Sequence, residues 1–186
     1  MSIYTSVETD IQGCVLIKPR VFNDERGRLV KTFHADFFAE LGLQTDFREE
    51  YYSVSKRGVL RGLHFQLPPH DHVKCVTCLQ GSLFDVVVDL RRQSPTYRKH
   101  YTVHLDDVEC AMLYIPPGLA HGFYTLSDSA IFLNRTTSVY NPGSDTGIRW
   151  DSCGIDWPDA SPIISDKDRE MTGLNEFQSP FGHPVG

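Results

Sequence analysis

The stretch VKCVTCLQGSLFDVVVDL, residues 73–90, contains two short apolar runs separated by Gly81 and its neighbours. In an extended strand, successive side chains point to opposite faces. One face of residues 83–90 would then be wholly apolar, whereas the other would carry Asp85 and Asp89 between apolar neighbours. The pattern predicts two β-strands, and two carboxylates on a half-apolar face mark the second strand as unusual.

Short apolar runs of this kind recur along most of the chain. Glycine, proline, aspartate or serine separates them, which is typical of successive strands and turns. Many short strands with few helices favour an all-β sandwich or barrel, and a jelly roll fits best. The expected strands are residues 15–17, 51–55, 58–65, 73–79, 83–90, 100–105, 111–115, 122–126 and 130–139.

Only two short helices are expected. Residues 36–41 place apolar side chains on one face and are followed by a glycine. Ser165 and Asp168 form the S-x-x-acid pattern of a capping box, so a second helix should start there and run to about Leu174. Residues 22–27 are rich in turn formers and are predicted to form a turn.

Length and composition predict one globular domain. The chain has 186 residues and is 40% hydrophobic. We expect the domain to span residues 1–175 and residues 176–186 to form a loose tail, because the tail has little apolar pattern. The net charge of −6, without a run of like charge, argues against binding nucleic acid or an anionic membrane.

No apolar stretch approaches the roughly 20 residues that span a bilayer. Residues 1–10 lack the basic and apolar regions of a signal peptide, so a cytoplasmic protein is predicted. The five cysteines are scattered, which indicates reduced thiols. Cys75 and Cys78 form a C-x-x-C pattern, but in a strand they would point to opposite faces and could not share a metal.

A candidate site lies around RGVLRGLHFQ, residues 57–66. This short extended run carries Arg61, His64 and Gln66, and Lys74 follows on the next expected strand. The stem of Lys74 could lie along apolar surface while its ammonium reaches a cavity, although an ordinary surface lysine fits the sequence equally well. A cation and a titratable imidazole on one stiff element indicate a ligand-handling role.

Four further residues are candidates for the site only when they are considered together. His121 follows a Pro-Pro-Gly turn, and this P-x-G-x-x-H pattern resembles the second motif of the cupin superfamily; the residue serves either the site or the packing. Tyr140 could be a half-buried anchor at the end of a strand. Asp168 could be only a capping residue, and Arg26 only a solvated arginine in a turn.

A metal site is the obvious alternative for a cupin. His70 and His72 form an H-x-H pair, but no carboxylate follows them closely. Lys74 would lie beside the metal and repel it, because an ammonium is no ligand. We therefore predict no metal and no cofactor.

Taken together, these segments resemble the dTDP-4-dehydrorhamnose 3,5-epimerase family, cupin-fold enzymes that invert carbons next to the ketone of a nucleotide-linked 4-keto-6-deoxy sugar. The similarity extends from about residue 15 to residue 168. The motifs that carry it are FNDERG (22–27), GVLRGLHFQ (58–66), SPTY (94–97), IPPGLAHGF (115–123), Tyr140 to Trp150, IDWP (155–158) and SDKD (165–168).

The resemblance implies four catalytic roles. Removal of a proton next to a ketone needs a base, and His64 matches the family's histidine, with Asp168 matching the carboxylate that orients it. Lys74 matches the cation at the enolate oxygen. Inversion needs reprotonation from the opposite face, and Tyr140 matches the family's acid. Asp85, which we expect near Lys74 by strand pairing, is a second candidate partner for a site cation or for His64.

The resemblance also implies how the substrate is bound. Arg26 and Arg61 match residues that hold the pyrophosphate, for which bidentate guanidinium contacts are suited. The partner implied is a nucleotide-linked 4-keto sugar, and a homodimer with strands or arms exchanged between subunits is expected. The other residues expected to contact the substrate are Phe22, Gln66, His121 and Lys167.

The chain departs from the family pattern around the sugar pocket. Glu49 and Tyr51 replace a usual glutamine and asparagine, and Asn134 replaces a usual aromatic residue. The other departures are Leu29, Lys31 and Val139. The sugar, the base or the number of carbons inverted could therefore differ. A mono-epimerase, a ketosugar isomerase and a non-catalytic sugar-binding cupin stay open as alternatives.

Overall fold

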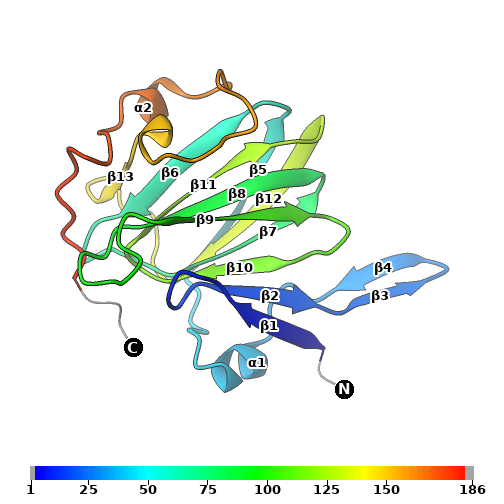
Figure 1. The fold of residues 1–186 in the computed structure, drawn as a ribbon. Coiled ribbons are helices and arrows are strands. Elements are labelled where there is room, and N and C mark those ends of the chain that lie inside the picture. The colour runs from blue at the N-terminus through cyan, green and yellow to red at the C-terminus, as the bar shows by residue number, and fades with distance from the viewer. Residues whose placement is uncertain (1–2, 183–186) are drawn as a thin grey trace.

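The computed structural model describes residues 3–182, which form two facing antiparallel sheets with a separate hairpin that extends from one end (Figure 1). The all-β prediction is confirmed. The first sheet has the order β1 (Tyr4–Glu8), β2 (Val15–Pro19), β10 (Met112–Ile115), β7 (Lys74–Gln80), β12 (Ser129–Thr136) and β5 (Glu49–Lys56). The second has the order β13 (Asp145–Gly147), β6 (Leu60–Gln66), β11 (Leu119–Thr125), β8 (Ser82–Asp89) and β9 (His100–Asp106).

The hairpin consists of β3 (Val21–Asp24) and β4 (Gly27–Val30), and the predicted turn lies at its tip. Figure 1 shows this hairpin projecting away from the two sheets. The short helix α1 (Ala35–Glu40) is confirmed, and a one-turn 3₁₀ helix spans Trp150–Ser152. Strands β1, β3, β4 and β13 were not predicted. β1 and β13 are short and mostly polar, whereas β3 and β4 occupy most of the predicted turn, which is confined to residues 25–26.

The second predicted helix is correct at its start and wrong in its length. In α2 (Asp166–Arg169), the Ser165 hydroxyl accepts a hydrogen bond from the Asp168 amide at 3.1 Å and so caps the helix, as one half of a capping box does. The helix nevertheless ends after one turn. Leu174 is drawn into the core instead, and the intervening Gly173 is a poor helix former.

Three apolar clusters follow the strand parity. Val87 lies in the cluster between the sheets, whereas Val86 and Val88 lie in a second cluster on the outer face of their sheet. Cys75 and Cys78 lie in different clusters, so they point to opposite faces as predicted, and all five cysteines are free. The third cluster lies under α1.

The expected loose tail packs against the protein over the residues that the structure describes. Ser179 and Phe181 are buried, and the Phe181 ring lies 5.7 Å from that of Phe65. Phe177 contacts the same ring at 5.4 Å. Two phenylalanines four residues apart thus cover the outer face of β6. The overall composition of the tail, on which the prediction was based, does not reveal this spacing. Residues 183–186 lie outside the described part.

Among residues 3–182, no helix has the length and apolarity that crossing a membrane requires.

Candidate active site

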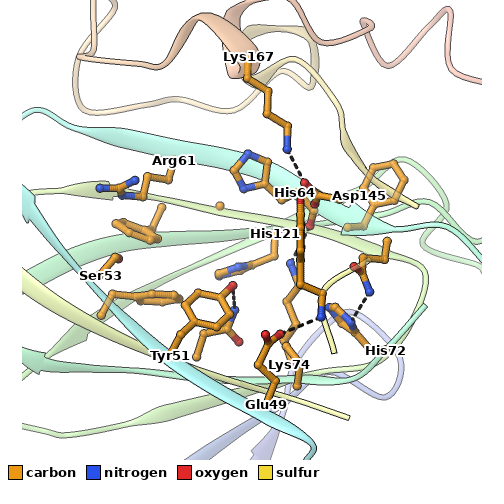
Figure 2. A pocket seen from close by; sticks show the side chains of 18 residues that line it. Glu49, Tyr51, Ser53, Arg61, His64, His72, Lys74, His121, Asp145 and Lys167 are labelled. Carbon is orange, nitrogen blue, oxygen red and sulfur yellow. Dashed lines mark hydrogen bonds and ion pairs between the residues drawn. The ribbon is translucent and has the colours of Figure 1, made fainter. Parts of the chain in front are cut away.

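A cavity of about 480 Å³ opens between the two sheets (Figure 2). In Figure 2, Glu49, Tyr51 and Ser53 lie along one wall, while Arg61 and His64 face them from β6. The remaining lining residues, from both sheets and the loops that join them, are Phe65, Gln66, His72, Lys74, His121, Gly122, Phe123, Phe132, Asn134, Thr136, Tyr140, Asp145 and Lys167.

A β-bulge places Arg61 and His64 on the same side of their strand. Residues three apart in a regular strand face opposite ways, but His64 pairs with His121 and Arg61 pairs with Phe123, only two residues further along β11. The extra residue in β6 turns both side chains into the cavity. Gly62 permits this path, because its φ is +138° and an added Cβ would lie 2.6 Å from the Cα of Gly122.

His64 and Asp168 form a hydrogen-bonded pair. His64 Nε2 lies 2.7 Å from Asp168 Oδ1, and the other carboxylate oxygen accepts a bond from the Gly62 amide at 3.1 Å. Burial opposes ionisation of Asp168, but the contacts with His64 and Gly62 outweigh it and lower the pKa of the carboxyl group. An ionised carboxylate only accepts, so His64 carries its proton on Nε2 and leaves Nδ1 free to act as a base.

Lys74 reaches the same cavity from β7. Its side chain follows the face that carries Val76 and Cys78, as predicted, and its ammonium donates to the carbonyl oxygen of His64 at 3.0 Å. The residue is only 8% exposed. Burial lowers the pKa of the ammonium group to about 8, although the carboxylates of Asp145 and Asp85 oppose this shift.

Asp85 lies near Lys74, as expected, since the two charges influence each other's pKa, but not by strand pairing: β8 pairs with β11 and β9 and belongs to the other sheet. Asp85 is hydrogen-bonded to His121, whose Nε2 lies 2.9 Å from Asp85 Oδ2, and it makes no bond to His64. Both partners are buried. Burial raises the pKa of Asp85 despite the nearby His121 and Lys74. His121 therefore lines the cavity with a ring whose Nε2 is already engaged.

The amide of Gln66 is engaged at both ends by protein groups. Its Oε1 accepts from the Asn141 amide at 2.6 Å, and its Nε2 donates to the His70 carbonyl at 2.8 Å and approaches His72 Nδ1 at 3.1 Å. The H-x-H histidines thus belong to a hydrogen-bonded network around this glutamine. His70 adds a contact from its Nε2 to the Asn141 side chain at 3.2 Å.

Tyr140 lines the cavity but is 57% exposed, and it follows the end of β12 in a loop. Its backbone amide donates to Glu49 Oε2 at 3.0 Å. Lys167 also lines the cavity and is paired with Asp145, whose hydrogen bond raises the pKa of the lysine. Glu49 thus lies at the cavity, where the sequence placed this departure from the family pattern, and Asp145 is a neighbour of the site for which the sequence provided no role.

Arg26 and Phe22 do not reach this cavity within one chain. Both lie in the projecting hairpin, where a separate surface pocket is lined by the hairpin residues and Lys31. The Arg26 guanidinium pairs with Asp24 of the same turn and is 84% exposed. The structure therefore does not bring them together with His64.

Two departures from the family pattern are direct cross-strand partners. Tyr51 of β5 is paired with Asn134 of β12, and Asn134 Nδ2 donates to the Tyr51 hydroxyl at 2.6 Å. Ser53, on the same face of β5, also lines the cavity. Its hydroxyl and the Asn134 Oδ1 are buried without a protein partner among the described residues. Strand parity from Glu49 could have identified Ser53 in advance.

Comparisons with known proteins agree with this geometry. The dTDP-4-dehydrorhamnose 3,5-epimerase family matches residues 8–176. The chain is 42% identical to the dTDP-4-dehydrorhamnose 3,5-epimerase of Shigella flexneri, over 87% of this chain and 91% of that protein. It is 38% identical to a dTDP-4-dehydrorhamnose 3-epimerase of Streptomyces niveus, over 89% of this chain and 82% of that protein.

Among solved structures, the chain is similar to a dTDP-6-deoxy-D-glucose-3,5-epimerase from Legionella pneumophila in complex with dTDP-4-keto-L-rhamnose. The TM-score is 0.93 at 34% identity, over 98% of this chain and all of that one. The match therefore includes both sheets and the strands that carry the cavity residues. The chain belongs to the dTDP-4-dehydrorhamnose 3,5-epimerase family and is an epimerase of deoxysugar biosynthesis.

Proposed function

We propose that the chain inverts C3, C5 or both carbons of a dTDP-linked 4-keto-6-deoxyhexose through an enolate. One observation carries the proposal: an imidazole oriented by an ionised carboxylate and a buried ammonium line the same cavity. His64 and Asp168 form the first pair at 2.7 Å, and the Lys74 ammonium lies 3.0 Å from the carbonyl oxygen of His64. A base and a cation close together are what carbon-acid chemistry next to a ketone requires.

The proposed step is a proton transfer in two halves. His64 Nδ1 takes the proton from the carbon next to the ketone, the C–H electron pair becomes part of the enolate π system, and the Lys74 ammonium stabilises the oxygen anion. The Tyr140 hydroxyl then gives its proton to the opposite face of that carbon, and the ketone re-forms. The imidazolium and the phenolate return to their starting states by exchange with solvent.

A nucleotide-linked substrate is supported by the cations at the cavity and by the ligand of a similar solved structure. Arg61 lines the cavity, where its Nε donates to Ser55 Oγ at 3.0 Å. The other N–H groups of its guanidinium can donate to a substrate diphosphate. Lys167 adds a second cation at the cavity. The Legionella neighbour was solved with dTDP-4-keto-L-rhamnose, which supports the same substrate class for this chain.

We further propose that the protein is a cytoplasmic homodimer in which the hairpin of one subunit supplies Arg26 and Phe22 to the cavity of the other. The projecting hairpin, with Phe22 37% exposed, supports this arrangement. Co-expression of Arg26→Ala and His64→Asn subunits tests it, because a mixed dimer would contain one intact site. Recovered activity is expected; two monomeric, inactive species would contradict the exchange.

Mono-epimerisation is the second candidate. The Streptomyces niveus relative is named as a 3-epimerase, and Tyr51 and Asn134 alter the cavity wall. Both outcomes are distinguished by proton NMR in deuterated water with a panel of nucleotide 4-keto sugars, including dTDP-4-keto-6-deoxyglucose. Exchange at C3 and C5 supports the 3,5-epimerase, and exchange at one carbon supports the mono-epimerase. A moved ketone would indicate an isomerase, and binding without exchange a non-catalytic protein.

A further inference from the structure

The loop that carries Tyr140 has no apolar anchor. No residue from Thr137 to Gly143 is buried, and Val139 and Tyr140 are more than half exposed. A segment with few buried contacts is free to open locally unless other interactions hold it. The position of the Tyr140 ring must therefore be set by polar contacts.

Two side chains hold consecutive backbone amides of this loop. The Tyr140 amide donates to Glu49 Oε2 at 3.0 Å, and the Asn141 amide donates to Gln66 Oε1 at 2.6 Å. Glu49 belongs to β5 of the first sheet, and Gln66 belongs to β6 of the second. The loop is thus tied to both walls of the cavity.

Gln66 is itself fixed in one orientation. Its side-chain NH₂ group can only donate, and it faces the His70 carbonyl at 2.8 Å and His72 Nδ1 at 3.1 Å. Its oxygen is thereby directed at the Asn141 amide. Burial and the charge of Lys74 lower the pKa of His72 to about 3, so the imidazole stays neutral near neutral pH and adds no positive charge beside the Gln66 amide.

We propose that Gln66 and Glu49 are positioning residues that set the hydroxyl of Tyr140 against the face of the substrate opposite to His64. The inference rests on the proposed function. Gln66 lies two residues after His64 on β6. The same strand therefore carries the proposed base and holds the loop that carries Tyr140, the proposed acid. Neither residue needs to touch the substrate for this role.

The proposal separates two half-reactions. His64 alone removes a proton and can return a solvent deuteron to the same face, which appears as wash-in without inversion. Inversion also requires a correctly placed Tyr140. A misplacement of about 1 Å can cost about 100-fold in rate, so loss of either contact should impair inversion while sparing wash-in.

The experiment compares Gln66→Leu and Glu49→Ala with two matched controls by NMR in deuterated water. Glu49→Gln keeps an acceptor for the Tyr140 amide, and Glu50→Ala removes the next carboxylate on β5, which pairs with Arg135 and does not line the cavity. Inversion should fall about 10- to 100-fold in the two test variants, with wash-in within about threefold of wild type. Both controls should retain the wild-type ratio.

A parallel fall of inversion and wash-in would overturn the inference in favour of general damage, and so would no change in either rate. In a Tyr140→Phe background, Glu49→Ala should cause no further loss of inversion. Fluorotyrosine labelling provides a readout that does not require activity. The fluorine resonance of residue 140 should shift or broaden in the test variants but not in Glu50→Ala, and an unchanged resonance would contradict the positioning role. Absence of wash-in by the wild-type protein would instead refute the proposed function.

Discussion

Replacing Lys74 with Met should stabilise the protein and inactivate it. The ammonium is buried, and its pKa falls from 10.5 to about 8 in the folded state. At about 1.36 kcal/mol per pKa unit, keeping this charge in the fold costs about 3 kcal/mol near neutral pH. Loss of the hydrogen bond to the His64 carbonyl destabilises the variant by about 1 kcal/mol, so the net stabilisation at pH 7 should be about 2 kcal/mol.

The sign of the effect fixes its pH dependence. Between the folded pKa of about 8 and the unfolded value near 10.5, the unfolded chain binds more protons, so wild-type stability rises with pH through this window. The advantage of Lys74→Met should therefore be full below pH 8, shrink through this window, and become a deficit of about 1 kcal/mol above pH 10.5, where only the lost hydrogen bond counts. Replacement of the exposed Lys18 by Met is the matched control.

Urea unfolding at a series of pH values measures the difference between Lys74→Met and the wild type. The same variant should lose about 100- to 1,000-fold in kcat, because the enolate oxygen loses its cation. A variant that is less stable than wild type at pH 7, or a difference that does not change from pH 8 to 10.5, would refute the reasoning. Retained activity would remove Lys74 from the mechanism.

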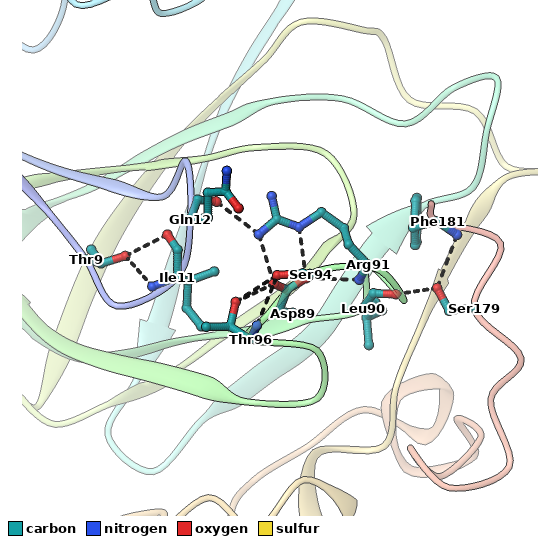
Figure 3. Close-up of polar contacts among 10 residues, drawn as sticks. All are labelled: Thr9, Ile11, Gln12, Asp89, Leu90, Arg91, Ser94, Thr96, Ser179 and Phe181. Carbon is teal, nitrogen blue, oxygen red and sulfur yellow. Dashed lines mark hydrogen bonds and ion pairs between the residues drawn. The ribbon is translucent and has the colours of Figure 1, made fainter. Parts of the chain in front are cut away.

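Three further predictions follow from the structure. Wild-type kcat/KM should decline above about pH 8 as Lys74 loses its proton, and a pH profile flat to pH 10 would contradict this. Asp168→Asn should lower kcat about 100- to 10,000-fold because the amide favours the wrong tautomer of His64, with little change in the urea midpoint, since the Ser165 cap remains. Asp89→Asn should destabilise the fold by about 3–5 kcal/mol in urea unfolding, because Asp89 holds the buried Arg91 guanidinium through two contacts at 2.9 Å (Figure 3). Burial opposes the ionisation of Asp89, but bonds from Arg91, Ser94 and Thr96 lower its pKa, so its contribution is present above about pH 4 and lost as the pH falls through the folded value. A decrease in the free energy of unfolding of less than about 1 kcal/mol in Asp89→Asn would contradict this structural role of Asp89.

Strand parity was enough to predict much of the fold and part of the site. It separated Val87 from Val86 and Val88, and it placed Lys74 on the inner face. These predictions succeed because a strand has a fixed side-chain period of two. The joint placement of Arg61 and His64 was expected from their proximity in sequence and from the family resemblance, not from strand parity. It depends on the bulge opposite β11, which requires knowledge of strand pairing.

The contacts that could not be predicted from the sequence join segments that are far apart along the chain. Glu49 and Tyr140 are 91 residues apart, and the Tyr51 and Asn134 pair spans 83. Both depend on the pairing of β5 with β12 or on the loop that follows it. The hydrogen bond of Asp85 with His121 was missed for the same reason, because β7 and β8 are neighbours in sequence but belong to different sheets.

Hydrogen exchange in His64→Asn tests most directly whether His64 is the base that removes the carbon-bound proton of the substrate. The variant and the wild type would be incubated with dTDP-4-keto-6-deoxyglucose in deuterated water, and the C3 and C5 protons followed by NMR. Wash-in and inversion are expected of the wild-type protein and neither of the variant, whose circular dichroism spectrum should be unchanged. Exchange by His64→Asn at the wild-type rate would exclude His64 as the base.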